Sequence, residues 1–214
     1  FTAEDFFEIG HSGQEGVDHW LHSKDSRIEF AVKIEDGTLI LGEATSEQSF
    51  FELADGKLEI INRGEFGGAL NFIPKKNPSD TSSICKAPID FVFEFKDQIY
   101  FVAGSSHGVD QGGGLFRLLK TGNRFTYEEV LRLDSAPEAI AIYKGLILIA
   151  GYSKFIIIDN FKAKNIIEEA LWDGHYPNSI AVKNEEEVYI GMRSGYSKVS
   201  LLDGEVKYYH YQEF

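Results

Sequence analysis

The first candidates for chemistry in this chain of 214 residues are two groups of histidine and aspartate side chains. Imidazole and carboxylate groups together suit zinc or another transition metal. Their spacings match no standard metal motif, so we expect solvated loop histidines and predict neither a metal nor a cofactor. The groups are His11, Asp18, His19 and His22 near the N-terminus, and His107 and Asp110 in a glycine-rich segment.

Nucleophilic and acid–base catalysis find little support in the sequence. Ser12 directly follows His11, but the Gly-x-Ser-x-Gly pattern of a nucleophile elbow is not formed there. Paired carboxylates can hydrolyse glycosides, and Asp134, Asp159 and Asp203 recur near the ends of apolar runs. These are turn positions, where aspartate satisfies backbone amides. We therefore predict no catalytic residue.

The acidic balance of the chain favours a different role. Its 34 acidic and 21 basic residues give a net charge of −13, which would repel nucleic acid and anionic lipid and permits a basic partner. We therefore expect a partner-binding surface of acidic and aromatic side chains on loops. The residues predicted for it are Asp110, Trp172, Glu185, Glu186 and Tyr196.

An internal repeat indicates the strands and turns that would position the predicted partner-binding residues. Gly-Tyr-Ser-Lys occurs at residues 151–154 and again at 195–198, and each copy runs into an apolar stretch that ends in aspartate. The openers Pro-Glu-Ala-Ile-Ala-Ile at 137–142 and Pro-Asn-Ser-Ile-Ala-Val at 177–182 are repeated in the same way. Repeats of this length filled with strand-like runs predict an array of stacked sheets.

Four units follow from strand-like runs separated by turn signals such as Asp36-Gly37 and Asp203-Gly204. They span about 26–63, 88–134, 137–171 and 177–211. The segment 63–85 is expected to be a long surface loop. Residues 1–25 fit no unit and are expected to contribute a strand that closes the ring of units, a short helix on one face, or the remnant of a fifth unit.

The openers and the Gly-Tyr-Ser-Lys strand starts resemble the β-propeller superfamily, in particular irregular bacterial propellers without WD or kelch signatures. The resemblance implies an all-β fold: a small propeller of about four four-stranded antiparallel blades, with five as the alternative, in one domain over 1–214. Propellers serve mainly as binding platforms, and a minority are enzymes with a site in the central channel.

Our leading hypothesis is a non-catalytic, monomeric protein that binds a basic protein, similar in character to immunity proteins that neutralise nuclease toxins. The alternative is a secreted or periplasmic propeller that binds or hydrolyses a small ligand or glycan at its channel, using His107 and Asp110. A fragment of a larger propeller is the third reading. The compartment stays open: we expect the cytoplasm for an immunity protein, and the periplasm or secretion if a leader was removed before Phe1. We expect no membrane span.

Overall fold

The computed structural model describes the chain except for residues 10–13, 26, 45–48, 106–111, 123 and 212–214. The chain divides into two compact units. Unit 1 combines both ends of the sequence, Phe1–Thr45 and Glu138–Phe214, whereas unit 2 is the continuous segment Ser46–Pro137. None of the described helices is long and apolar enough to cross a membrane.

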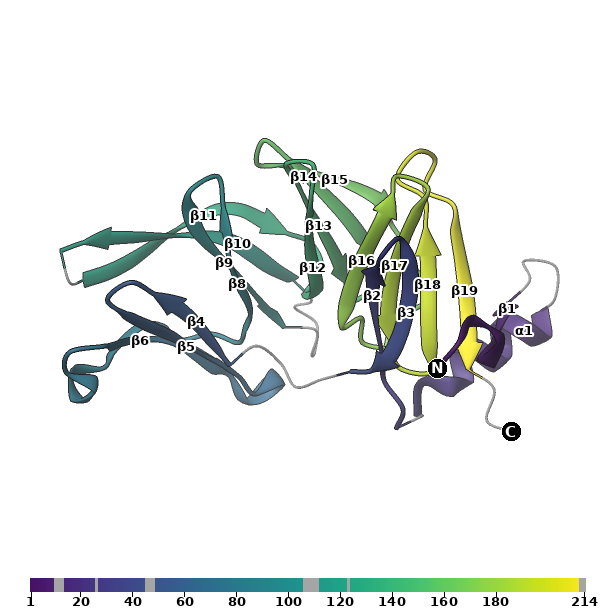
Figure 1. The fold of residues 1–214 in the computed structure, drawn as a ribbon, viewed down its shortest axis with the longest axis horizontal. Coiled ribbons are helices and arrows are strands. Elements are labelled where there is room, and N and C mark those ends of the chain that lie inside the picture. The colour runs from purple at the N-terminus through teal and green to yellow at the C-terminus, as the bar shows by residue number, and fades with distance from the viewer. Residues whose placement is uncertain (10–13, 26, 45–48, 106–111, 123, 212–214) are drawn as a thin grey trace. The chain divides into compact units, whose positions relative to one another are not determined.

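Unit 2 contains two four-stranded antiparallel sheets, in each of which neighbouring strands follow one another along the chain (Figure 1). The first sheet is β4 (Phe50–Leu53), β5 (Gly56–Asn62), β6 (Gly68–Pro74) and β7 (Ser82–Cys85). The second is β8 (Ile89–Phe95), β9 (Gln98–Ser105), β10 (Gly112–Thr121) and β11 (Arg124–Leu133).

Unit 1 holds two further meanders and a hairpin. One meander is β12 (Pro137–Tyr143), β13 (Leu146–Gly151), β14 (Phe155–Asp159) and β15 (Lys162–Ile167). The other is β16 (Ser179–Asn184), β17 (Glu187–Met192), β18 (Gly195–Val199) and β19 (Val206–Tyr211). The hairpin is β2 (Phe30–Glu35) and β3 (Thr38–Glu43).

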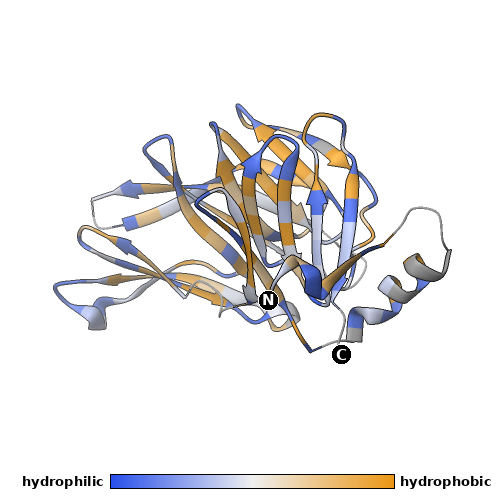
Figure 2. Cartoon of the chain, turned by 45° about the vertical axis from the view of Figure 1, so that its right-hand side comes forward, coloured by the Kyte–Doolittle hydropathy of each residue, from blue (hydrophilic) through white to orange (hydrophobic). Residues whose placement is uncertain are grey.

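The all-β class predicted from the sequence is confirmed, and the described residues form four antiparallel meanders of four strands each. The predicted units 88–134, 137–171 and 177–211 each contain one of these meanders. Figure 2 shows why the strands could be predicted from the sequence: hydrophobic residues are concentrated along the strands, and hydrophilic residues are concentrated at the hairpin ends.

The predicted grouping of the first unit is wrong. The four strands within 26–63 exist, but β2 and β3 form a two-stranded sheet of their own, whereas β4 and β5 pair onward with β6 and β7. The segment 63–85 is therefore not one long loop. Asn62 and Gly68 are register partners, and only the turn around Gly64–Phe66 separates β5 from β6.

The N-terminal segment joins the last sheet of unit 1. After a short 3-10 turn at Ala3–Asp5, β1 (Phe6–Ile9) pairs antiparallel with β19, with Phe6 opposite Tyr211 and Ile9 opposite Tyr208. Helix α1 (Gln14–His22) and a second 3-10 turn (Ser23–Asp25) follow. Of the alternatives open for residues 1–25, the structure has both an added strand and a short helix.

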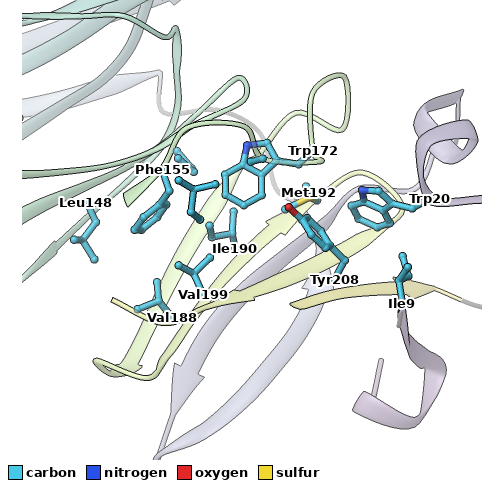
Figure 3. Packing of buried hydrophobic residues seen from close by; sticks show 14 residues of the cluster. Ile9, Trp20, Leu148, Phe155, Trp172, Val188, Ile190, Met192, Val199 and Tyr208 are labelled. Atoms are coloured by element: carbon cyan, nitrogen blue, oxygen red, sulfur yellow. The ribbon is translucent and has the colours of Figure 1, made fainter. Parts of the chain in front are cut away.

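Apolar strands of unit 1 and the N-terminal helix share one core (Figure 3). Five of the six residues of β13 and of β17 are buried, as expected of strands covered on both faces. Tyr208 lies between Trp172 and Trp20, with ring centroids 6.4 Å and 5.5 Å away. Its hydroxyl accepts a hydrogen bond from the Leu171 amide at 2.9 Å, and the Trp20 indole N–H donates to the Leu171 carbonyl.

These contacts predict the effect of Tyr208→Phe. Removing the hydroxyl leaves the partly buried Leu171 amide without its acceptor, so the free energy of unfolding should fall by about 1–2 kcal/mol, measured by chemical denaturation. Tyr211→Phe is the matched control, because no hydrogen bond of the Tyr211 hydroxyl occurs among the described residues. An equal loss in both variants would contradict this role of the Tyr208 hydroxyl.

Candidate partner-binding surface

Two of the predicted partner-binding residues lie together at one end of unit 1. Glu185 and Glu186 form the turn between β16 and β17, and Glu186 is exposed. The Leu201 amide, in the turn between β18 and β19, donates to the Glu185 carbonyl at 2.7 Å. The Lys144 ammonium, in the turn between β12 and β13, pairs with the Glu185 carboxylate at 2.5 Å. Three hairpin turns therefore meet at Glu185.

The two predicted aromatic anchors are corrected by the structure, because both are buried. Trp172 is 0% exposed in the unit 1 core, and its indole N–H donates to the Gly151 carbonyl at 2.9 Å. Tyr196 is 4% exposed and stacks on Tyr209 with ring centroids 4.6 Å apart. Neither can reach a partner while the unit stays folded. Tryptophan and tyrosine are common both in interfaces and in protein cores, and only the packing of the folded chain shows which of these locations a given residue takes.

The predicted loop residues His107 and Asp110 lie outside the described residues, as do His11 and Ser12. His22 is described, and its Nδ1 lies 2.5 Å from the Asp18 carbonyl oxygen of its own helix. The described part of the chain contains no group of three or more His, Cys, Asp or Glu side chains placed to hold a metal ion.

Around the Glu185 turn lies a surface that we call the acidic end, made of Glu185, Glu186, Leu202, Asp203 and Glu205. A notch of about 360 Å³ is lined by the last four of these and by Ser200, Lys198 and Lys207. Leu202 stands in it with 66% of its surface exposed. The sequence predicted Asp203 as a turn residue, but no sequence pattern predicted that Leu202 would be exposed.

Some carboxylates of this region accept side-chain hydrogen bonds from described residues, which lower their pKa values. Lys144 holds the pKa of Glu185 below its usual range, and the Ser200 hydroxyl does the same for Asp203. Lys183, Tyr189 and Asn184 together lower the pKa of neighbouring Glu187 to about 2.

The carboxylates of Glu186 and Glu205, in contrast, form no ion pair with any described residue. The acidic end can therefore accept a cationic side chain at Glu186 and Glu205, and offers Leu202 as an apolar contact.

At the other end of the same sheet, a buried histidine could be mistaken for a catalytic group. His175 is 0% exposed, and its ring stacks on Trp20 with centroids 4.1 Å apart. Its Nε2 lies 3.0 Å from the Trp20 carbonyl oxygen and 3.2 Å from the Ser23 hydroxyl. Burial lowers the pKa of His175 to about 4, so the imidazole is neutral at pH 7. These contacts tie Trp20 and Ser23 to the rest of unit 1.

Comparisons with known proteins assign no family to the chain. No protein-family model matches it, and no curated protein matches it. Among solved structures, the chain is similar to the β-propeller domain of Cps50 (Swd1) from Myceliophteria thermophila, at 10% sequence identity and a TM-score of 0.44. The match covers 88% of this chain and 64% of that domain, so the chain spans less than two thirds of its length.

The depressed pKa of His175 predicts a pH dependence of stability. The unfolded chain takes up this proton near pH 6.5, whereas the folded chain takes it up only near pH 4. The stabilisation is therefore complete above pH 6.5 and is lost as the pH falls toward 4. Between pH 7.5 and 4.5 the free energy of unfolding should drop by about 2 kcal/mol, measured by urea denaturation.

His175→Phe should remove this drop whatever its effect on absolute stability, because the phenyl ring cannot take up a proton. His22→Gln should keep it. An unchanged pH slope in His175→Phe would assign the dependence to other groups.

Proposed function

We propose that the chain is a non-catalytic binding protein that docks a basic protein partner on the acidic end of unit 1. The observation that carries the proposal is the exposed Leu202 beside the carboxylates of Glu186 and Glu205, which pair with no cation in the described part of the chain. An apolar contact surrounded by a charged rim is the usual composition of a specific interface.

The distribution of charge supports the choice of unit 1. Of the 34 acidic and 21 basic residues, unit 1 holds 21 acidic and 11 basic, and unit 2 holds 13 and 10. The net charge of −13 therefore resides mostly in unit 1. A negative surface of this kind attracts a cationic protein over several ångströms and raises the association rate, in a way that salt screens.

Rigid support of the acidic end also favours binding. The Lys144–Glu185 pair and the hydrogen bond from the Leu201 amide hold three hairpin turns together. Little conformational freedom is then lost when a partner docks, which lowers the entropic cost of association. Because Lys144 already neutralises Glu185, we assign to Glu185 a positioning role and to Glu186 the contact with the partner.

The specific form that we propose is an inhibitor that neutralises a basic toxin such as a nuclease. A basic nucleic-acid-binding surface complements carboxylates spaced along hairpin turns, and occupying it would block the toxin's substrate. This form makes a prediction beyond binding: the retained partner should lose its activity when the chain is added in equal amount.

The first test compares two double variants that change the charge equally. Immobilised wild-type protein, Glu186→Gln/Glu205→Gln and the control Glu52→Gln/Glu94→Gln of unit 2 are exposed to source-cell lysate at low salt and eluted with a salt gradient. We expect a basic protein on the wild type and the control, with retention on the acidic-end variant reduced about tenfold. Equal retention on all three proteins would refute the acidic end as the docking surface.

Leu202→Ser separates apolar contact from charge once a partner is captured. The association rate should stay near that of the wild type, because the charges are unchanged. The dissociation rate should rise about tenfold, measured by surface plasmon resonance. A dissociation rate like that of the wild type would remove Leu202 from the interface.

A further inference from the structure

We infer that unit 2 carries a separate binding site for a small acidic sugar, in a pocket between its two four-stranded sheets. The pocket encloses about 810 Å³, within the range of ligand-binding clefts. It is formed by the β4–β5 turn, the end of β6 with the segment that follows it, β7, and the start of β11. The inference concerns residues remote in sequence from the acidic end, and it does not depend on the proposed protein partner.

Two closely packed phenyl rings, Phe72 and Phe125, belong to the lining of the pocket. The rings of Phe72 and Phe125 lie with centroids 4.6 Å apart. Phe72 rests against Gly56, where an added Cβ would stand 2.5 Å from the phenyl ring and 2.4 Å from the Ile73 carbonyl oxygen. Only glycine admits this approach. Phe72 is 3% exposed, and the Lys120 ammonium lies 5.0 Å from the centroid of the half-buried Phe125 ring. The accessible part of Phe125 is therefore the aromatic surface left for the polarised C–H groups of a sugar ring.

The charge of the pocket is opposite in sign to that of the whole protein. Lys75, Lys76 and Arg124 line it, are exposed, and pair with no carboxylate in the part of the chain that the structure describes. The carboxylate of Asp55 is already neutralised by Lys120, which also lowers its pKa. Three cations that pair with no described carboxylate, in a chain of charge −13, point to an anionic ligand.

The remaining polar groups decide which kind of anion fits. Asn77, Ser82, Ser83 and Thr126 offer neutral donors and acceptors, as a ligand with several hydroxyl groups requires. Asp80 lines the same pocket, and its carboxylate would accept a hydroxyl hydrogen but repel a polyphosphate. A ring with one carboxylate and several hydroxyls, a uronic acid, satisfies both conditions.

In the resulting arrangement, Lys75, Lys76 and Arg124 bind the carboxylate, and the accessible part of Phe125 contacts the sugar ring. Arginine can bind a carboxylate with two parallel hydrogen bonds, so Arg124 would orient the ligand carboxylate more strongly than either lysine. No bond is made or broken, so the site is a binding site and its readout is affinity.

The test is calorimetric titration of the full chain at about 50 mM salt, where screening of exposed charges is moderate. The probes are galacturonate and mannuronate trisaccharides and a hyaluronan tetrasaccharide, with maltotriose as the neutral analogue and AMP and tripolyphosphate as phosphate anions. We expect at least one uronate to bind and maltotriose to bind about tenfold more weakly or not at all.

Variants assign the binding to the pocket. Lys75→Gln/Lys76→Gln and Arg124→Gln should each weaken uronate binding about tenfold, and Phe125→Leu should weaken it by removing the ring face. Lys162→Gln/Lys164→Gln, an equal charge change on β15 of unit 1, should bind like the wild type, and circular dichroism checks that every variant is folded. Binding of no uronate, tighter binding of AMP or tripolyphosphate, or an equal loss in the β15 control would overturn the inference.

Discussion

The antiparallel pairing of β1 with β19 is the interaction on which unit 1 depends. It joins residues at opposite ends of the chain, with Phe6 opposite Tyr211. Forming it costs the conformational entropy of closing a loop of about 200 residues. That cost grows only slowly with loop length, so a short strand with buried side chains can offset it when other contacts help. Unit 1 is consequently discontinuous in sequence, and unit 2 is the continuous segment between its two parts.

The contacts that stabilise the pairing of β1 with β19 come from the residues that follow β1. Trp20 stacks on His175, and Ser23 lies within hydrogen-bonding distance of the same ring. The Ser194 hydroxyl donates to the Ser23 carbonyl at 2.6 Å, in the turn between β17 and β18. A neutral imidazole is required in this layer, because an unpaired buried charge would be costly. The N-terminal segment and the last sheet therefore stabilise each other.

This anchoring at one end of the sheet leaves the hairpin turns at the other end free to carry charge. Turns can hold acidic residues without burying them, and the Lys144–Glu185 pair joins neighbouring turns instead of leaving each one independent. Unit 2 differs in character, since its acidic and basic residues are nearly balanced and its pocket is lined by three cations that pair with no described carboxylate. The two units thus offer surfaces of opposite sign, which suits two different classes of ligand.

The sequence by itself determined the strands and many of the turns. Apolar runs of five or six residues bounded by turn residues predicted β12 to β19 within a few positions, because strand formation and hairpin turns depend on neighbouring residues. At Asp36-Gly37 both residues adopt positive φ, 48° and 76°, as the dipeptide predicted. The acidic turn at Glu185 and Glu186 could be found in the same way.

Tertiary structure alone decided which strands pair and which aromatic side chains face water. The strands β4 and β5 pair with β6 and β7 because the core of unit 2 brings Leu58, Leu70 and Phe72 together, and no local pattern encodes that choice. Trp172 and Tyr196 are buried, whereas Leu202 is exposed. Side-chain hydrophobicity alone would have predicted a buried leucine. Burial depends on what segments distant in sequence place against a side chain, and that information arises only when the chain has folded.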